Sequence, residues 1–393
     1  MFEKLGAKAI AVPLGIALFL FCLLGTVVAP MLHAEPHSMP FAIVNLDKGA
    51  TTVLGSNNVG NTLTDNLMSG ETSLVSSDDD EESSDDDSSM DISWTQLDSE
   101  QDALDALANN EYYGAIIIPA NFTSQQMSTL VGSSNAPELK VYLNKGKNPQ
   151  AASTMQTTLE AGMLKAGVGV DVEMVNDRDL GATSYGETMM VQMLSMPLFM
   201  MTMMVSILTS MIFWKNDATG LRAKNRWLAL LAQLGIIVVF SAIVSALAMC
   251  VDYVIGGINL PVADLYPFVW FISLCTMTAF VGLCDLCFPL GAVVAVCTFA
   301  LGTGTAMFAP EMLPDFWANW VCPWVPQAHL GNGVRQIVYF YTQPSGNDVM
   351  VPTILCCVGL VALFIATLIP HRDKDKPAEA AHAEAATANE ATS

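Results

Sequence analysis

Carboxylates form the densest group of side chains in this sequence that could do chemistry. The run at residues 76–91 contains Asp78, Asp79, Asp80, Glu81, Glu82, Asp85, Asp86 and Asp87. Carboxylate oxygens are natural Ca²⁺ ligands, but the run lacks the Asp-x-Asp-x-Asp-Gly spacing and the later Glu of a formed calcium loop. We therefore interpret residues 76–91 as a solvated, disordered insertion, and we expect no metal site.

Thioethers form a second group, which falls in and beside one apolar segment. Its members are Met189, Met190, Met193, Met196, Met200, Met201, Met203, Met204 and Met211. Several recur at a spacing of three and four residues, which places them on one helix face. Thioether sulfur binds soft Cu(I), yet no His or Cys accompanies these residues. We predict an adaptable apolar face that suits an amphiphilic or lipid-like substrate.

Residue sets for catalysis do not stand out. No Gly-x-x-x-x-Gly-Lys-Ser/Thr loop occurs, so the chain cannot itself hold ATP phosphates in the P-loop manner. The histidines, which could act as bases or metal ligands, are scattered: His33, His37, His329, His371 and His382. Cys284-x-x-Cys287 has redox or zinc spacing but no second pair, so we interpret it as apolar packing. We expect no catalytic residue and no cofactor in this chain.

The elements that position these groups are mostly apolar. The chain of 393 residues is 52% hydrophobic and 14% charged, and its charges avoid long tracts, as lipid hydrocarbon requires. Segments long enough to cross a bilayer lie at residues 9–32, 192–213, 227–251, 263–284, 287–308 and 351–369. The net charge of −22 argues against nucleic-acid binding, which needs a basic surface.

Positive charges predict the orientation of these spans. They cluster before the first span (Lys4, Lys8), after the second (Lys215, Arg222, Lys224, Arg226) and after the last (Arg372, Lys374, Lys376). With six crossings all three clusters fall on one side. We predict that residues 1–8 and the disordered tail 371–393 are cytoplasmic and that residues 33–190 lie outside. Span 9–32 is longer than a signal-peptide core, which favours an uncleaved anchor.

The polar segment 33–190 predicts a mixed α/β domain without a disulfide framework, because it contains no cysteine. Apolar runs and alternation predict strands at 41–44, 112–118 and 139–143. Helices are predicted after a cap at Asp98 or Ser99, after a cap at Asn121, and from residue 149 to about 179. The expected fold is therefore a six-span α-helical membrane protein, with this domain inserted between spans one and two and five spans in 191–370.

Three blocks of residues carry a family resemblance. They are residues 40–49 (PFAIVNLDKG), 112–122 (YYGAIIIPANF) and 311–317 (EMLPDFW), the last followed by 323–326 and 333–335. In this order and layout, the chain over about residues 5–370 resembles the phage infection protein (YhgE/Pip-like) branch of the ABC type-2 transporter permeases. The resemblance implies a permease subunit of an exporter in a bacterial cell membrane. It also implies a homo- or heterodimer that uses ATP through a separate cytoplasmic ABC ATPase.

The resemblance assigns roles to two loops. Loop 214–227 corresponds to an ATPase-coupling loop, with Lys215, Asn216, Asp217, Arg222, Lys224 and Arg226. Loop 309–350 is rich in Pro and Trp and corresponds to re-entrant helices, with an outer gate formed by Glu311, Pro314, Phe316, Trp317 and Arg335. Charge alone would also explain the first loop as a positive-inside anchor, and an aromatic interfacial belt would explain the second.

Two other functions compete with ATP-driven export. A proton-driven carrier needs ionisable groups at mid-depth, whereas Asp252, Asp264 and Asp285 lie at span ends, so that mechanism is disfavoured. The second is a non-transporting surface protein, a phage receptor or a scaffold for a secretion machine, that binds through its outer domain.

Overall fold

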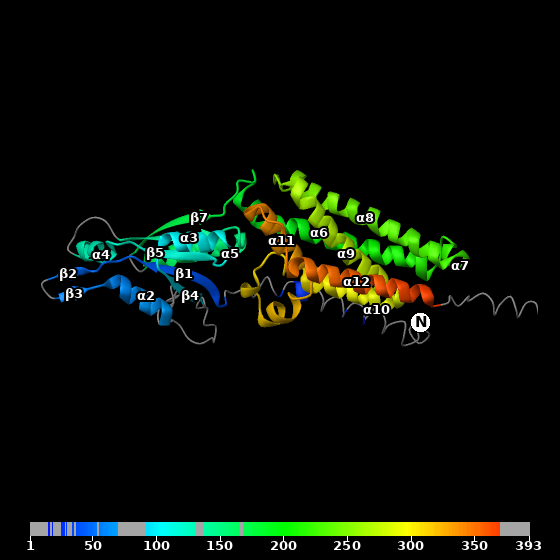
Figure 1. Cartoon of the computed structure of the whole chain (residues 1–393), viewed down its shortest axis with the longest axis horizontal. Helices are drawn as coiled ribbons and strands as arrows, with labels where there is room; N and C mark the ends of the chain where they lie inside the picture. Colours follow the sequence, from blue (N-terminus) through cyan, green and yellow to red (C-terminus); the bar gives the residue numbers. More distant parts are fainter. Residues whose placement is uncertain are drawn as a thin grey trace, which may run out of the picture.

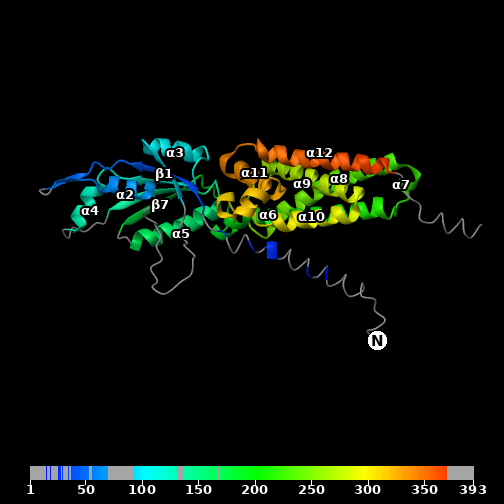
Figure 2. The same ribbon diagram turned by 90° about the horizontal axis from the view of Figure 1, so that it is seen from below.

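The computed structural model describes residues 37–52, 55–69, 92–130, 137–165 and 168–369, together with isolated positions before residue 37. Most of the predicted span 9–32, the acidic run 76–91 and the tail 371–393 lie outside the described residues. The described chain is elongated, with a sheet domain at one end and a bundle of long helices at the other (Figure 1, Figure 2).

A five-stranded mixed sheet forms the centre of the sheet domain. Its strands, in spatial order, are β4 (Ile92–Leu97), β1 (Met39–Asn45), β5 (Gly114–Ile118), β6 (Glu138–Asn144) and β7 (Gly169–Val175). β1 runs parallel to β4 and β5, β6 runs parallel to β7, and β5 and β6 are antiparallel. β1 and β5 are apolar along most of their length because both faces of the sheet are covered.

Successive side chains of β1 enter two different cores. Val44 faces α3 (Glu100–Ala108), whereas Phe41 faces α5 (Pro149–Lys165). The second core continues past the sheet into the segment between helices α10 (Phe288–Gly302) and α11 (Pro326–Phe340) of the bundle. We call it the shared core; its sheet-domain members include Met39, Phe41, Ile43 and Ile116, and its bundle members include Met307, Phe308, Met312, Leu313, Val321 and Val325.

Asp47 holds the turn that follows β1. Its carboxylate accepts hydrogen bonds from the backbone N–H groups of Gly60 (3.2 Å) and Thr123 (3.1 Å) and from the Thr123 hydroxyl. These residues lie in the first turns of α2 (Val59–Ser69) and α4 (Phe122–Leu130), where a negative charge is favourable. Asp47 therefore anchors the start of α4, where the sequence predicts a cap at Asn121. The motif at residues 40–49 accordingly has a structural role.

Among the residues that the structure describes, the bundle has six helices of 15 or more residues: α6 (Ser184–Ser210), α8 (Arg226–Val254), α9 (Val262–Leu286), α10 (Phe288–Gly302), α11 (Pro326–Phe340) and α12 (Asn347–Leu368). α6 continues directly into a π-helix, Met211–Lys215. Within the described ranges, four helices are long and apolar enough to cross a membrane: α6 with its extension, α8, α9 and α12. α9 is central, since 72% of its most apolar window is buried, against 28–33% for the others.

The predicted span at 287–308 is shorter than expected. α10 ends at Gly302 after 15 residues, short of the roughly 20 that a crossing helix needs. At that point the chain packs closely on α11, since a Cβ on Gly302 would lie 2.3 Å from the side chain of Gln327. The residues that follow turn into the shared core instead of extending the helix.

Two further boundaries differ from the predictions. α6 begins at Ser184, capped by the Thr183 hydroxyl, so this helix starts inside the segment assigned to the outer domain. The helix predicted over 149–179 is wrong in its second half, because α5 ends at Lys165 and β7 follows. β7 gains a full ladder of pairs with β6, and this tertiary pairing overrides local helix propensity.

α9 and α12 approach each other backbone to backbone. A Cβ on Gly282 would lie 2.2 Å from the carbonyl oxygen of Gly359, and a Cβ on Gly359 would lie 2.5 Å from the carbonyl oxygen of Thr278. Small residues at such crossings let two membrane helices pack backbone to backbone.

We expect Gly359→Ala to destabilise the protein by about 1–3 kcal/mol, because the new methyl group would meet backbone atoms that cannot move aside. Gly235→Ala is the matched control, since a Cβ on Gly235 of α8 meets nothing within 4 Å. Thermal unfolding in detergent measures both. Equal melting temperatures for the two variants would contradict the close contact.

Candidate functional site

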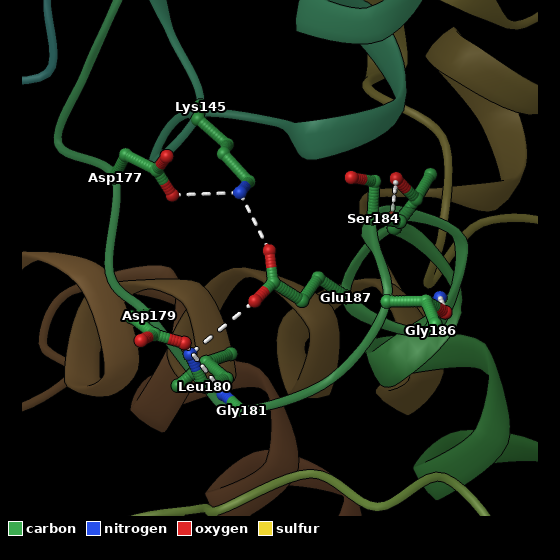
Figure 3. Close-up of polar contacts among 10 residues, drawn as sticks. Lys145, Asp177, Asp179, Leu180, Gly181, Ser184, Gly186 and Glu187 are labelled. Carbon is green, nitrogen blue, oxygen red and sulfur yellow. Dashed lines mark hydrogen bonds and ion pairs between the residues drawn. The ribbon is translucent and has the colours of Figure 1, made fainter.

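A partly buried ion-pair network joins the sheet domain to the first described helix of the bundle (Figure 3). Lys145, which follows β6, places Nζ 2.6 Å from Asp177 Oδ1 and 2.6 Å from Glu187 Oε2. Glu187 lies in the first turn of α6, and its other oxygen accepts the Leu180 N–H at 3.2 Å. Burial lowers the pKa of Lys145, but its bonds to the two carboxylates outweigh burial and raise the pKa overall.

Other contacts reinforce this junction from the α11 side. The Arg178 guanidinium donates to the carbonyl of Val338 at 3.1 Å and lies 4.8 Å from the ring centre of Tyr341. The Asn148 amide donates to the carbonyl of Met307 at 3.0 Å, next to the shared core. The sheet domain is therefore fixed to both α6 and α11.

A polar cavity of about 230 Å³ lies between the sheet domain and the bundle. Its lining comprises Asn110, Tyr113 and Lys147 from the sheet domain and Ala309, Pro310, Glu311, Asn332, Arg335, Gln336 and Asp348 from the bundle. The Tyr113 hydroxyl donates to Glu311 Oε2 at 2.8 Å across this boundary. Burial, with the Glu311 carboxylate, raises the pKa of Tyr113 well above its usual value, so the phenol stays a neutral donor.

Asp348, in the first turn of α12, connects that helix to α11. Its carboxylate lies 3.0 Å from His329 Nδ1 and accepts from the amides of Asn332 (3.4 Å) and Gln336 (2.9 Å). All three partners lie on α11, so the bundle side of the cavity is a fixed wall.

The structure divides the predicted outer-gate residues into two groups. Glu311 and Arg335 line the same cavity. Pro314, Phe316 and Trp317 lie on the short segment between α10 and α11, where Phe316 and Trp317 make an edge-to-face contact at 5.1 Å. Phe316, Trp320 and Trp324 are exposed, as in an interfacial belt, while Trp317 packs on the shared core.

The methionine face of α6 forms a shallow apolar groove of about 430 Å³. It is lined by Tyr185, Met189, Gln192, Met193, Met196, Pro197, Met200 and Val251. This lining contains no charged side chain, and Gln192 contributes the one amide. Thioether chains adapt their shape readily, so the groove can accommodate apolar groups of different outline.

The basic loop lies at the end of the bundle opposite the sheet domain, where α7 (Leu221–Lys224) is labelled (Figure 1, Figure 2). Asp217 accepts from the backbone N–H groups of Arg222 and Ala223 and so holds α7. Asn225 caps α8 by accepting from the N–H groups at its start.

The six residues of the predicted coupling loop differ in exposure. Lys215, Asn216 and Lys224 are exposed, and Asp217 and Arg226 are half-buried. Arg222 is 9% exposed: its guanidinium donates to the Trp214 carbonyl at 2.6 Å and stacks 3.9 Å from the Trp214 ring centre. The exposed lysines are therefore available to a partner, whereas Arg222 is a packing residue.

Beneath Arg222 lies a small cluster of buried polar side chains. Asp285, Gln233 and Ser210 come from α9, α8 and α6 and are each at most 7% exposed. Their side-chain oxygens have no hydrogen-bond partner of normal geometry among the described residues. The cluster lies below the loop surface, and sequence inspection placed Asp285 only at a span end.

Metal and thiol chemistry find little support in the part of the chain that the structure describes. No group of three or more His, Cys, Asp or Glu side chains there could hold a metal ion. Cys284 is buried and Cys287 is exposed, and both are free thiols.

Comparison with known proteins identifies the family. A family model described as ABC-2 family transporter protein matches residues 10–369. The chain belongs to this family. No curated protein and no solved structure matches the chain.

ABC-2 permeases are membrane components of transporters that work with a cytoplasmic ATPase, and they are not themselves enzymes as a rule. The four long apolar helices agree with that membership and make this chain a multi-pass protein of a cell membrane. Two surface features of this ABC-2 family member have no assigned role at this point: the exposed basic loop and the methionine groove.

Of the ten described residues that line the polar cavity, the sequence pattern singles out two, Glu311 and Arg335, and it indicates none of the ion-pair junction. Tyr113 belongs to a block that the sequence predicted as a core strand, and Lys145 and Lys147 were assigned no role. The one sequence feature that pointed to these residues is that two lysines, Lys145 and Lys147, lie close together in a strongly acidic segment. Their carboxylate and carbonyl partners come from distant parts of the chain, which no local pattern reveals.

We expect Lys145→Met to destabilise the protein by about 3–5 kcal/mol, because it leaves the carboxylate of Glu187 buried without its cation. Lys140→Met is the matched control in the same strand region. Its ion pairs are more than a third exposed and should contribute less than about 1 kcal/mol.

The double variant Lys145→Met with Glu187→Leu should recover part of the loss, as measured by thermal unfolding in a double-mutant cycle. The folded-state pKa of Lys145 lies above its ordinary value of 10.5, so its contribution is complete below pH 10.5 and is lost at higher pH. Additive effects in the cycle would contradict a direct interaction.

Proposed function

We propose that this chain is the permease subunit of an ABC exporter, from the phage infection protein (YhgE/Pip-like) branch of the ABC-2 family. A separate cytoplasmic ATPase drives it, and ATP is bound by that partner. The single observation that carries the proposal is the match of the ABC-2 family over residues 10–369. The family membership favours transport over a receptor or scaffold role.

The loop 214–227 is the surface that we assign to the ATPase. Lys215 and Lys224 are exposed there, and Arg222 and Asp217 hold the loop in a fixed shape from beneath. A preformed, positively charged projection can dock without a large ordering cost. This role goes beyond that of a positive-inside anchor, which needs charge but no fixed shape.

The orientation follows from the two ends of the molecule. The basic loop and the sheet domain lie at opposite ends of the helices (Figure 1). If the basic loop is cytoplasmic, as the charge rule requires, the sheet domain lies outside the cell. Six spans, counting residues 9–32 and the segment that contains α10, would then place both termini in the cytoplasm.

The substrate and the oligomeric state are part of the same proposal. The methionine groove suits the apolar part of an amphiphilic substrate, and one side of the groove is open to contact by another molecule. A second permease chain would complete the pathway, so we propose a homo- or heterodimer. Three of the four long apolar helices bury only 28–33% of their apolar windows within one chain, which leaves ample surface for a partner and for lipid.

The decisive test is recovery of an ATPase with the full chain, purified in mild detergent. The variant Lys215→Glu with Lys224→Glu should reduce that recovery by about tenfold, because it reverses both exposed charges of the loop. Lys48→Glu is the matched control, since Lys48 is exposed at the opposite end of the molecule. Quantitative mass spectrometry of the purified samples measures the ratio.

Either of two results would count against ATPase coupling. One is that no ATPase is recovered with the unaltered protein under any mild condition. The other is that the double variant and the control retain the same amount of ATPase. Thermal unfolding of each variant distinguishes a lost contact from a lost fold.

Substitution of groove residues should change substrate range without changing membrane insertion. We expect Met193→Leu with Met200→Leu to reorder the rates at which a panel of amphiphilic dyes leaves cells, because Leu is stiffer and branched. Met204→Leu with Met211→Leu is the control, since these exposed residues of the same helical segment do not line the groove. An unchanged order would argue against the groove as a substrate surface.

A further inference from the structure

The polar cavity between the sheet domain and the bundle has features of a binding site that ATP-driven export does not explain. Its volume of about 230 Å³ suits a single small polar group, smaller than most drug-sized ligands. It shares no lining residue with the methionine groove or with the basic loop. A function for it must therefore come from its own side chains.

Two cations line the cavity, and neither has a carboxylate within ion-pair distance among the described residues. Lys147 Nζ donates to the carbonyls of Asn110 (2.8 Å) and Glu111 (3.0 Å) and lies 4.8 Å from the Tyr113 ring centre. Arg335 is 5% exposed and donates to the carbonyl of Ala306 at 3.0 Å and to Asn332 Oδ1 at 2.7 Å. Lysine has three N–H donors and arginine five, so both cations keep spare donors.

Acceptors with spare capacity line the same cavity. The Glu311 carboxylate receives one hydrogen bond from the described residues, that of the Tyr113 hydroxyl. A carboxylate with spare acceptor capacity favours a ligand that supplies N–H groups here.

The fourth charged side chain, Asp348, is already satisfied. It has three polar partners on α11, namely His329, Asn332 and Gln336. With Asp348 included, the lining carries two positive and two negative formal charges. A lone anion would face both carboxylates and a lone cation would face both Lys147 and Arg335, whereas a neutral ligand with separated charges would face neither penalty.

We propose that this cavity binds a small zwitterion that carries a primary ammonium and an oxyanion. The oxyanion accepts hydrogen bonds from the spare donors of Lys147 and Arg335. The ammonium donates to the Glu311 carboxylate. Because the lining comes from both the sheet domain and the bundle, the ligand stabilises their junction.

Two sources offer this chemistry. One is the ethanolamine phosphate head group of a membrane lipid, and the other is a free amino acid or a similar soluble zwitterion. The cavity lies at the end of the bundle that joins the sheet domain, because its lining comes from both parts. The proposal does not depend on transport or on an ATPase, and the test below uses neither.

Calorimetric titration of the full chain in detergent tests the ligand class with three probes: phosphoethanolamine, ethanolamine and inorganic phosphate. Phosphoethanolamine should bind saturably and at least about tenfold more tightly than either half. This comparison needs no variant. Weak or absent phosphoethanolamine binding, or equal binding of phosphate alone, would overturn the proposal.

Variants test the assignment of each half. Glu311→Gln should weaken phosphoethanolamine binding about tenfold while leaving phosphate binding equal or stronger, since it removes the partner of the ammonium. Lys147→Met should weaken the binding of both probes, and Lys140→Met, outside the cavity, should change neither. Unaltered phosphoethanolamine affinity in both Glu311→Gln and Lys147→Met, with thermal unfolding confirming that each is folded, would refute the site.

Lipid nanodiscs distinguish the two sources. The binding of soluble phosphoethanolamine is compared in discs of phosphatidylethanolamine and in discs of phosphatidylcholine, whose choline group has no N–H donor. Weaker binding in the phosphatidylethanolamine discs assigns the cavity to the lipid head group, because that lipid then competes for the site. Equal binding in both kinds of disc assigns it to a soluble zwitterion.

Discussion

The shared core is the interaction on which the rest of this structure depends. The segment between α10 and α11 is too broken to satisfy its own backbone as a membrane helix would, and it is too apolar to lie free in water. Met312, Leu313 and Val321 of this segment are instead buried in the same core as Phe41 and Ile43 of the sheet. The sheet domain and the bundle are therefore one folding unit at this boundary.

Polar contacts surround that core and fix its geometry. Lys145 binds Glu187 at the start of α6, Arg178 binds the end of α11, and Tyr113 binds Glu311. Each is a contact between residues far apart in the chain, and each is partly buried. Unpaired charge at such positions is costly, so these contacts specify one arrangement of the two parts.

Local sequence patterns predicted the helices and strands themselves better than the residues that these elements contact. The apolar runs at 41–44 and 139–143 lie in β1 and β6, Ser99 caps α3 as expected, and the long apolar segments after residue 190 lie in α6, α8, α9 and α12. β7 was missed because its pairing with β6 decides its conformation. α10 was predicted too long because Gly302 meets Gln327 from another helix, a contact that hydropathy does not record.

For the candidate functional residues too, sequence patterns indicated where some of them lie but not how they pack. Charge asymmetry found the loop 214–227, because membrane orientation acts on sequence-local charge. It could not show that Arg222 is buried against Trp214 while Lys224 is exposed, since that depends on packing. Glu311 and Arg335 were singled out, whereas their cavity neighbours Tyr113 and Lys147 belong to another domain of the chain and carried no signal of their own.

The backbone contact between Gly282 and Gly359 has a mechanical consequence. Because no side chains lie between the two backbones here, α9 and α12 pack as a tightly joined pair. One end of this pair carries Asp348 beside the polar cavity, and the other carries the Leu368 carbonyl, to which Arg226 of the basic loop donates. The pair therefore connects the polar cavity and the basic loop, at opposite ends of the bundle, through continuous packing.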